Sequence, residues 1–279
     1  MKLSVFTVAT PDLTPEELAA ASAAVGLDGI EWRYTEVPEA RRNEKPSYWG
    51  NNLCTLSPLA GPGEIDRFKE AAEAQDLKTL GLMAYLRLGD LEGTEKLLSA
   101  ARRMSAPFVR LPVPGYDRST PYPELLKRGQ DYLREAADLC RQYGVKGLLE
   151  THHGTIAASA SAALRLAERF DPDHIGVLYD PGNMVYEGYE NYRMGLELLG
   201  PYLAHVHMKN AGWMPPSGDP EGEWQAGWRP MSQGMVPWRR VVEDLRAVGY
   251  DGYIGVEDFS GQYGSAEMLK AFAAYMRSL

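Results

Sequence analysis

Short apolar runs alternate along this chain with longer segments whose apolar residues recur at helical spacing. The runs predict eight strands and the periodic segments predict eight helices. The predicted strands are 3–9, 29–32, 78–85, 108–111, 145–150, 175–180, 202–207 and 253–257. The predicted helices are 15–25, 64–75, 91–104, 122–143, 159–169, 192–199, 236–248 and 266–277.

Strict alternation of strand and helix is typical of α/β proteins. It favours a single (β/α)8 TIM barrel that spans residues 1–279 as one domain. A doubly wound open sheet would show the same alternation. No G-x-G-x-x-G phrase follows the first predicted strand, which argues against the dinucleotide-binding form of that fold.

A glycine-containing phrase recurs between helix and strand. Residues 24–30 closely match residues 247–253, and residues 142–148 are a looser third copy. Glycine after a helix supplies the left-handed residue that ends it, so the phrase marks a short loop rather than a functional box. The copies are separated by about three strand–helix units of roughly 31 to 35 residues each. They therefore precede the second, fifth and eighth strands.

The last four predicted strands each end in a residue that can bind a metal. These residues are Glu150, Asp180, His207 and Glu257. The carboxyl ends of barrel strands meet at one mouth, where strand-end residues are typically catalytic. Three carboxylates and one imidazole suit Mn²⁺, Mg²⁺ or Co²⁺ better than structural zinc.

The order Glu, Asp, His-x-His, Glu over these strands resembles the xylose isomerase-like TIM-barrel superfamily. The phrase 249–252 (Gly-Tyr-Asp-Gly) and the phrase 29–31 (Gly-Ile-Glu) also resemble it. That group contains sugar isomerases and epimerases, inosose and dehydroshikimate dehydratases, and endonuclease IV. The resemblance implies that Glu150, Asp180, His207 and Glu257 bind a divalent metal, and among the ions that suit these donors we expect Mn²⁺. It also implies that the two glutamates move protons at a carbon next to a carbonyl, through an enediolate.

Some neighbours of these residues depart from the ketose epimerase pattern. Asn183 stands where ketose epimerases carry histidine, and Met208-Lys209-Asn210 follows His207 in place of a Gly-Glu pair. The phrase Glu150-Thr151-His152-His153 is more similar to the dehydratases, and we expect His153 to act there as a catalytic acid or base. Endonuclease IV needs more histidines than the five present here.

Further residues near the strand ends are candidates for substrate binding. We expect this role for Asn183, Lys209, Arg110 and Arg33. The alternatives are a turn cap for Asn183 and structural ion pairs for the three basic residues. His205 lies two residues before His207, so it faces the same side one layer deeper and is expected to be a hydrogen-bonded core histidine.

Composition narrows the class of partner. The 279 residues are 44% hydrophobic with a formal net charge of −9, which argues against broad nucleic-acid binding. Cys54 and Cys140 fit no metal spacing, no run is long enough to span a membrane, and the N-terminus lacks a signal-peptide pattern. We therefore expect a cytoplasmic protein with a small sugar or polyol-derived substrate, no nucleic-acid partner and no membrane partner, and a homo-oligomer stays open.

Two long loops are expected to follow strands two and seven, at 34–59 and 208–235. The second holds Trp213, Trp224 and Trp228, which could stack on a sugar or form a dimer contact. The sequence as a whole predicts a metal-dependent sugar isomerase or epimerase. A metal-dependent lyase or dehydratase on a keto-sugar, keto-inositol or cyclic keto-acid is the alternative. A non-catalytic sugar-binding barrel is disfavoured, because all four predicted ligands are intact.

Overall fold

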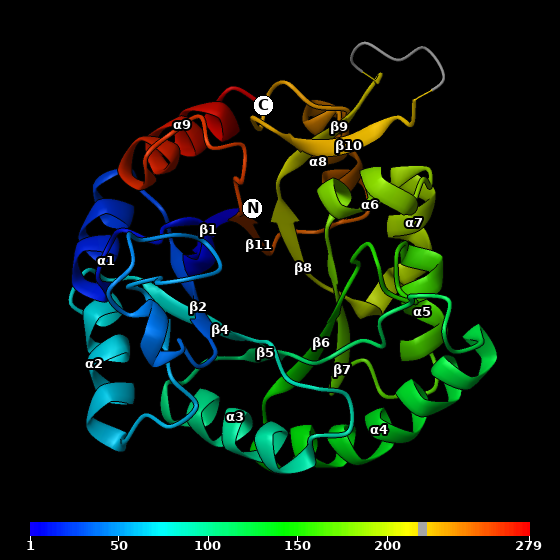
Figure 1. The fold of residues 1–279 in the computed structure, drawn as a ribbon, viewed down its shortest axis with the longest axis horizontal. Helices are drawn as coiled ribbons and strands as arrows, with labels where there is room; N and C mark the ends of the chain where they lie inside the picture. The colour runs from blue at the N-terminus through cyan, green and yellow to red at the C-terminus, as the bar shows by residue number, and fades with distance from the viewer. Residues whose placement is uncertain (217–221) are drawn as a thin grey trace.

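A closed parallel barrel forms the centre of the molecule (Figure 1). The computed structural model describes residues 1–216 and 222–279. Each barrel strand pairs in parallel with its neighbours, and β1 pairs with both β2 and β11, which closes the sheet. The barrel strands are β1 (Lys2–Phe6), β2 (Gly29–Tyr34), β4 (Lys78–Ala84), β5 (Phe108–Arg110), β6 (Lys146–Glu150), β7 (Ile175–Tyr179), β8 (Leu203–Met208) and β11 (Tyr253–Val256). The predicted (β/α)8 barrel is confirmed.

Helices surround the barrel as an outer ring (Figure 1). They are α1 (Pro15–Ala24), α2 (Pro62–Glu73), α3 (Leu91–Arg103), α4 (Tyr122–Tyr143), α5 (Ala160–Ala167), α6 (Pro181–Glu187), α7 (Tyr192–Leu199), α8 (Trp238–Ala247) and α9 (Ser265–Arg277). The sequence does not predict α6, a short helix that begins directly after Asp180. The first and last helices, α1 and α9, are in contact with each other, and this contact completes the ring.

Local sequence signals set several helix ends as predicted. The Thr14 hydroxyl accepts a hydrogen bond from the Glu17 N–H, and the Glu17 carboxylate accepts one from the Thr14 N–H, which forms a capping box before α1. Gly26, Gly144 and Gly249 have φ of 74°, 66° and 80°. The recurring glycine phrase therefore ends three helices in the left-handed conformation.

The structure shortens the first predicted strand and shows short elements within both predicted long loops. Residues 7–9 form a 3-10 turn, η1 (Thr7–Ala9), in which the Thr7 hydroxyl donates to the Cys54 carbonyl and accepts from the Arg33 N–H. The loop after β2 contains η2 (Glu39–Arg41) and β3 (Thr55–Leu56), which extends the sheet beside β2. The loop after β8 contains an antiparallel hairpin of β9 (Asn210–Met214) and β10 (Gln225–Arg229). Its residues 217–221 lie outside the described part.

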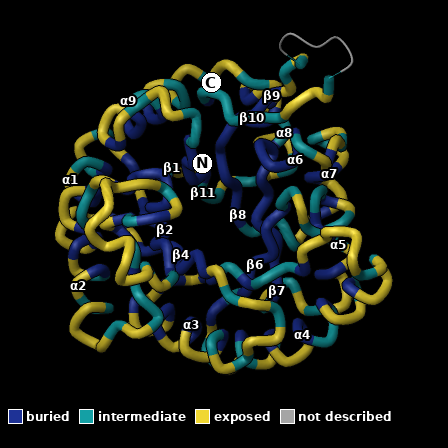
Figure 2. Tube along the Cα trace, viewed as in Figure 1, coloured by how far each residue is buried: buried dark blue, intermediate teal, exposed yellow. Residues whose placement is uncertain are grey.

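Buried residues follow the barrel strands and the inner faces of the helices (Figure 2). Between strands and helices lies a large core that includes Trp32, Trp238, Tyr179 and Phe272. Inside the barrel a smaller cluster contains Phe6, Val8, Leu80, Met83, Phe108, Leu148 and Leu178. Apolar side chains thus fill the lower barrel, and polar groups occupy its carboxyl-terminal mouth. In the described part of the chain, no helix has the length and apolar character that crossing a membrane requires.

Candidate active site

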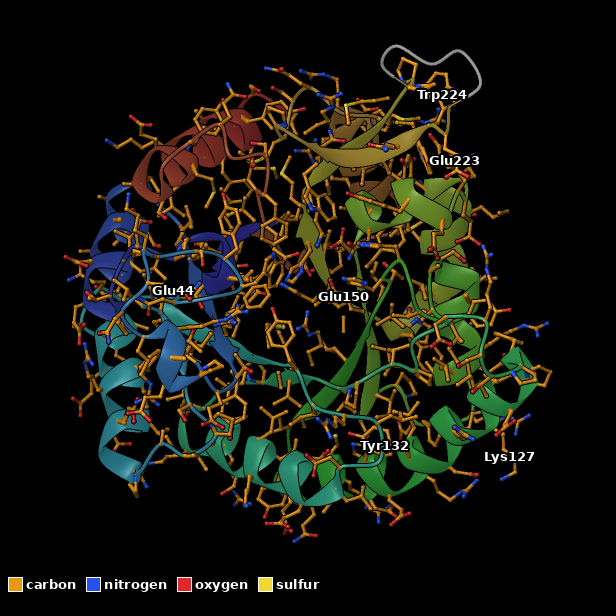
Figure 3. All side chains as sticks on the ribbon, viewed as in Figure 1. Glu44, Lys127, Tyr132, Glu150, Glu223 and Trp224 are labelled. Atoms are coloured by element: carbon orange, nitrogen blue, oxygen red, sulfur yellow. The ribbon has the colours of Figure 1, made fainter. Side chains whose placement is uncertain are left out.

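The predicted ligands converge on one point at the carboxyl-terminal mouth. Glu150 ends β6, Asp180 follows β7, His207 lies in β8 and Glu257 follows β11. Each offers one ligand atom, and these atoms all lie within 4.8 Å of one another. The four residues are at most 4% exposed, and Glu150 lies in the middle of the barrel (Figure 3). The structure therefore brings the whole predicted set together.

His207 is held so that one ring nitrogen faces the carboxylates. Its Nε2 lies 2.6 Å from Oε2 of Glu31, while its Nδ1 lies 3.3 Å from Glu257 and 3.9 Å from Glu150. A carboxylate at Nε2 keeps the proton there and leaves the lone pair on Nδ1 for a metal. Among the described residues Nδ1 has no hydrogen-bond partner, although it is buried. That is the arrangement expected of a nitrogen ligand.

Glu31 is itself held in position by residues deeper in the barrel. Its other oxygen, Oε1, accepts a hydrogen bond from the Ser4 hydroxyl at 2.8 Å and lies 2.9 Å from Nε2 of His205. Burial raises the pKa of Glu31, but the charges of His205 and His207 outweigh it and hold that pKa well below its usual range. Gly255 in β11 leaves the space for this carboxylate, since a Cβ at that position would clash with Oε1. His205 thus lies deeper in the barrel beside Glu31, and its pairing with this carboxylate is an ion-pair contact rather than the hydrogen bond that the sequence predicts.

Two cations lie against the predicted ligands. The guanidinium of Arg110 is 2.6 Å from Oε2 of Glu150, and Nζ of Lys209 is 2.9 Å from Oδ2 of Asp180 and also paired with Glu257. Burial raises the pKa of Glu150, yet Arg110 and the other nearby cations outweigh it and lower that pKa well below its ordinary value. Glu257 shows the same direction, with Lys209 as the main cation. Both glutamates are therefore ionised at neutral pH.

Negative charge nevertheless stays crowded at Asp180. Burial, reinforced by the charges of Glu150 and Glu257, raises the pKa of Asp180 to about 6 even though Lys209 opposes it. Although burial opposes it, the charges of Glu31 and Glu257 raise the pKa of His207 well above its ordinary value, so a bound metal would take the place of the proton on Nδ1. Three carboxylate oxygens and this imidazole nitrogen in one buried cluster suit a divalent ion of the Mg²⁺ and Mn²⁺ type. The residues present therefore fit the implied metal.

Asn183 holds the carboxylates of Glu150 and Asp180 in place through hydrogen bonds. Its Nδ2 donates to Glu150 at 3.0 Å, to Asp180 at 3.0 Å and to the Thr151 carbonyl at 3.1 Å. Its Oδ1 lies 3.2 Å from Nδ1 of His153. Asn183 is fully buried, so the geometry gives it a positioning role, and its predicted contact with substrate stays a prediction.

His152 and His153 both border the site because β6 has already ended at Glu150. Their rings stack at 4.4 Å, and the His153 ring also stacks on Tyr186 at 4.2 Å. Strand alternation would have turned the two rings to opposite sides, and the end of the strand removes that constraint. Burial, with the nearby charges of His152 and Lys209, lowers the pKa of His153 to about 4.

A cavity of about 530 Å³ opens above the predicted ligands. It is lined by Glu150, Glu257, Lys209 and Arg110, by His152, His153 and Thr155, and by an aromatic wall of Trp49, Tyr85, Trp228 and Phe259. The Trp228 ring of this wall lies 5.8 Å from the His153 ring. The orientation of this aromatic wall is not predicted from the sequence, because its residues come from four separate connections between strands and helices. Pockets that combine apolar walls with a few convergent polar groups are typical small-molecule sites.

Other predicted residues lie away from this cavity. Arg33 does not line it among the described residues; its guanidinium donates to the Thr55 hydroxyl at 2.7 Å and lies over the Tyr85 ring. Trp213 donates from its indole N–H to the Val185 carbonyl at 2.8 Å, and Trp224 is exposed. Of the three loop tryptophans, Trp228 reaches the cavity wall.

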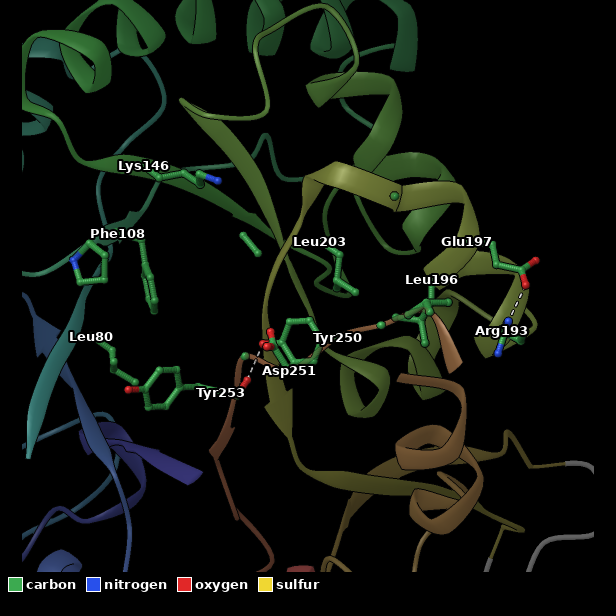
Figure 4. Close-up of a pocket in the computed structure, with 16 residues that line it drawn as sticks. Leu80, Phe108, Lys146, Arg193, Leu196, Glu197, Leu203, Tyr250, Asp251 and Tyr253 are labelled. Carbon is green, nitrogen blue, oxygen red and sulfur yellow. Dashed lines mark hydrogen bonds and ion pairs between the residues drawn. The ribbon is translucent and has the colours of Figure 1, made fainter. Parts of the chain in front are cut away.

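A second cavity of about 790 Å³ opens at the amino-terminal end of the barrel (Figure 4). It is lined by strand starts such as Leu80, Phe108 and Tyr253, and its Arg193 is paired with Glu197 at 2.6 Å. No group of three or more metal-binding side chains lies there in the described residues. Catalysis in TIM barrels occurs at the opposite, carboxyl-terminal face. The mouth that holds Glu150, Asp180, His207 and Glu257 is therefore the better active-site candidate.

The fold is a closed parallel barrel, and its last four strands direct acidic side chains and a histidine into one mouth. These two features define a class of barrel proteins whose small-molecule site lies at that mouth. The chain belongs to the xylose isomerase-like TIM barrel family, whose sequence profile matches residues 18–279. The predicted family membership is confirmed.

Three comparisons illustrate the similarity. The chain is 36% identical over 83 residues to the inosose dehydratase of Geobacillus kaustophilus (strain HTA426), which is 29% of this chain and 26% of that enzyme. Its fold is similar to that of 3-keto-D-glucoside 4-epimerase YcjR from E. coli, with a TM-score of 0.74, 17% identity and 100% coverage of both chains. It is also similar to the IolI protein with a bound zinc atom, with a TM-score of 0.72, 18% identity and coverage of 99% and 96%. The two structural likenesses show the fold alone.

Proposed function

We propose that this protein, as one domain over residues 1–279, is a divalent-metal-dependent sugar isomerase or epimerase that transfers a proton at a carbon next to a carbonyl. The observation that carries the proposal is the position of Glu150 and Glu257. They come from different sides of the barrel, both are ionised, and both face His207 Nδ1 at the cavity floor. A metal bound by Glu150, Asp180, His207 and Glu257 would polarise the substrate carbonyl.

The side chains divide the remaining work. One glutamate removes the proton next to the carbonyl, and the other glutamate, or the same one, returns it at the same or the adjacent carbon. The cations Arg110 and Lys209 lie beside these carboxylates and stabilise negative charge that develops on substrate oxygens. The aromatic wall of Trp49, Tyr85, Trp228 and Phe259 offers faces for an apolar side of the substrate.

Charge pairing favours a neutral substrate over a sugar phosphate. Of the cations that line the cavity in the described residues, Arg110 is bound to Glu150, so Lys209 alone would be free for a phosphate once a metal has taken its place at Asp180 and Glu257. Phosphate sites usually offer free Arg or Lys donors or a helix N-terminus. We therefore propose a neutral keto-sugar or keto-polyol as the substrate.

A lyase or dehydratase is the second candidate. His153 favours it, because this histidine is held neutral at the cavity wall, where its ring could accept the proton next to the carbonyl and donate one to the hydroxyl that leaves the adjacent carbon as water. The match to inosose dehydratases also supports it. The chain spans less than half the length of these relatives, so their activity is carried here as a proposal.

The two candidates are separated by incubation in D2O. Purified protein with measured bound metal would be given a panel of ketoses, aldoses, keto-inositols and their phosphates. Deuterium that enters a substrate carbon without loss of water supports an isomerase or epimerase, and a dehydrated product supports the lyase. Absence of bound metal together with absence of exchange over the panel would contradict both.

His153 is expected to stay neutral down to about pH 5. Its pKa is lowered from 6.5 to about 4, so the unfolded chain takes up a proton between these values that the folded protein does not. This histidine therefore lowers the stability of the fold as pH falls from 6.5 toward 4. NMR titration of the His153 ring, assigned with His153→Gln, measures the pKa directly. The variant should also lose less stability than the wild type between pH 7 and pH 5, and a ring pKa near 6.5 would contradict the expectation.

A further inference from the structure

The ammonium of Lys209 lies where the predicted ligand atoms converge. Its Nζ is 2.9 Å from Oδ2 of Asp180, is paired with Oε2 of Glu257 and is 3.9 Å from Oε1 of Glu150. The last two oxygens are also those nearest Nδ1 of His207. Three carboxylates from three strands thus surround one cation, and this cation is at most 3% exposed.

The surrounding chain is shaped to bring this lysine in. Lys209 comes from the end of β8, and its stem passes Gly182 in the turn after Asp180. A Cβ at position 182 would clash with Cγ and with the backbone of Lys209. The slot beside Gly182 is therefore part of what positions the ammonium among the carboxylates.

A divalent ion and this ammonium compete for the same oxygens. Carboxylate oxygens bind Mg²⁺ or Mn²⁺ at about 2.0–2.2 Å, on the side to which the ligands converge. Lys209 contacts them from that side, and two cations in one buried cluster repel each other with little screening by solvent. Arg110 differs, because it binds Oε2 of Glu150 and does not contact Oε1, the oxygen that accepts from Asn183 and lies nearest Nδ1 of His207.

We propose that Lys209 is an internal counter-cation that holds the metal-free site together and leaves the ligand oxygens when a divalent ion binds. The proposal rests on the metal dependence proposed above. A destination for the displaced ammonium is already present, since Nζ lies 5.3 Å from the ring centres of both Trp228 and Phe259. Both rings line the substrate cavity, so ion binding moves Lys209 toward the substrate.

Removal of the ammonium tests this directly through metal affinity. Lys209→Met keeps most of the stem and removes the charge. We expect the variant to bind Mn²⁺ at least about tenfold more tightly than the wild type in calorimetric titration, because the ion no longer displaces a cation. Without metal the variant should melt at a lower temperature than the wild type, and saturating Mn²⁺ should raise its Tm by more.

Two control variants separate displacement of Lys209 from a general effect of removing a positive charge. Arg110→Met removes one positive charge from the same cluster without vacating the converging oxygens, and Lys127→Met removes an exposed charge on α4. A clearly larger gain for Lys209→Met than for Arg110→Met supports displacement. Equal gains, or no gain for Lys209→Met, overturn it and leave the proposed metal enzyme intact. If neither wild type nor variant binds Mn²⁺, Mg²⁺, Co²⁺ or Zn²⁺, both proposals fall.

Folding of the methionine variant gives a second measurement. Three buried carboxylates without their cation destabilise the metal-free fold. If the variant is unfolded without metal, refolding in Mn²⁺ should recover it, as judged by circular dichroism and bound metal. Recovery that fails equally in Mn²⁺ and in EDTA overturns the proposal.

Discussion

Glu150→Gln and Glu257→Gln are each expected to lower turnover by about a hundredfold to ten-thousandfold, the range of a lost general acid or base. Glutamine has nearly the same shape but takes up no proton at neutral pH, so the proton next to the carbonyl loses its acceptor. Both carboxylates are held ionised by neighbouring cations, chiefly Arg110 at Glu150 and Lys209 at Glu257. The measurement is turnover and deuterium exchange on the substrate identified in D2O.

Loss of metal must be separated from loss of the base. Each variant would be assayed at saturating Mn²⁺ with its bound metal determined, and Glu135→Gln on the exposed side of α4 serves as the matched control. If two bases act, each variant loses exchange in one direction of the reaction. If one base acts, one variant keeps exchange and the other does not. A metal-loaded variant that retains near-normal turnover and exchange removes that glutamate from proton transfer.

The residues that the sequence predicted well are those whose signal is local. Glu150 and Asp180 each follow a buried apolar run, so the strand and its carboxyl end can be read without knowing any partner. Gly26, Gly144 and Gly249 mark helix ends in the same way. Once eight strands alternate with helices, the barrel itself places the strand ends at one mouth.

The sequence predicted less well where a role depends on the register between distant strands. Glu31 and His207 are 176 positions apart, and nothing near Glu31 indicates that it orients a histidine of β8. Lys209 was predicted beside the site, but its entry among the carboxylates depends on the slot at Gly182. The hairpin β9–β10 and the aromatic wall arise from loops, where apolar periodicity carries no information.

The contact between Glu31 and His207 leads to the second prediction with a large expected effect, which is on metal affinity. Glu31→Gln is expected to weaken Mn²⁺ binding by about ten- to a hundredfold, the usual cost of losing the partner that orients a ligand histidine. A glutamine amide can donate to Nε2 of His207, which would move the ring proton to Nδ1 and block the nitrogen that faces Glu150 and Glu257. The dissociation constant, measured by calorimetry, is the readout, with the exposed Glu36→Gln as matched control. A Glu31→Gln protein that binds Mn²⁺ as tightly as the wild type would show that Nδ1 of His207 is not presented to the ion by this carboxylate.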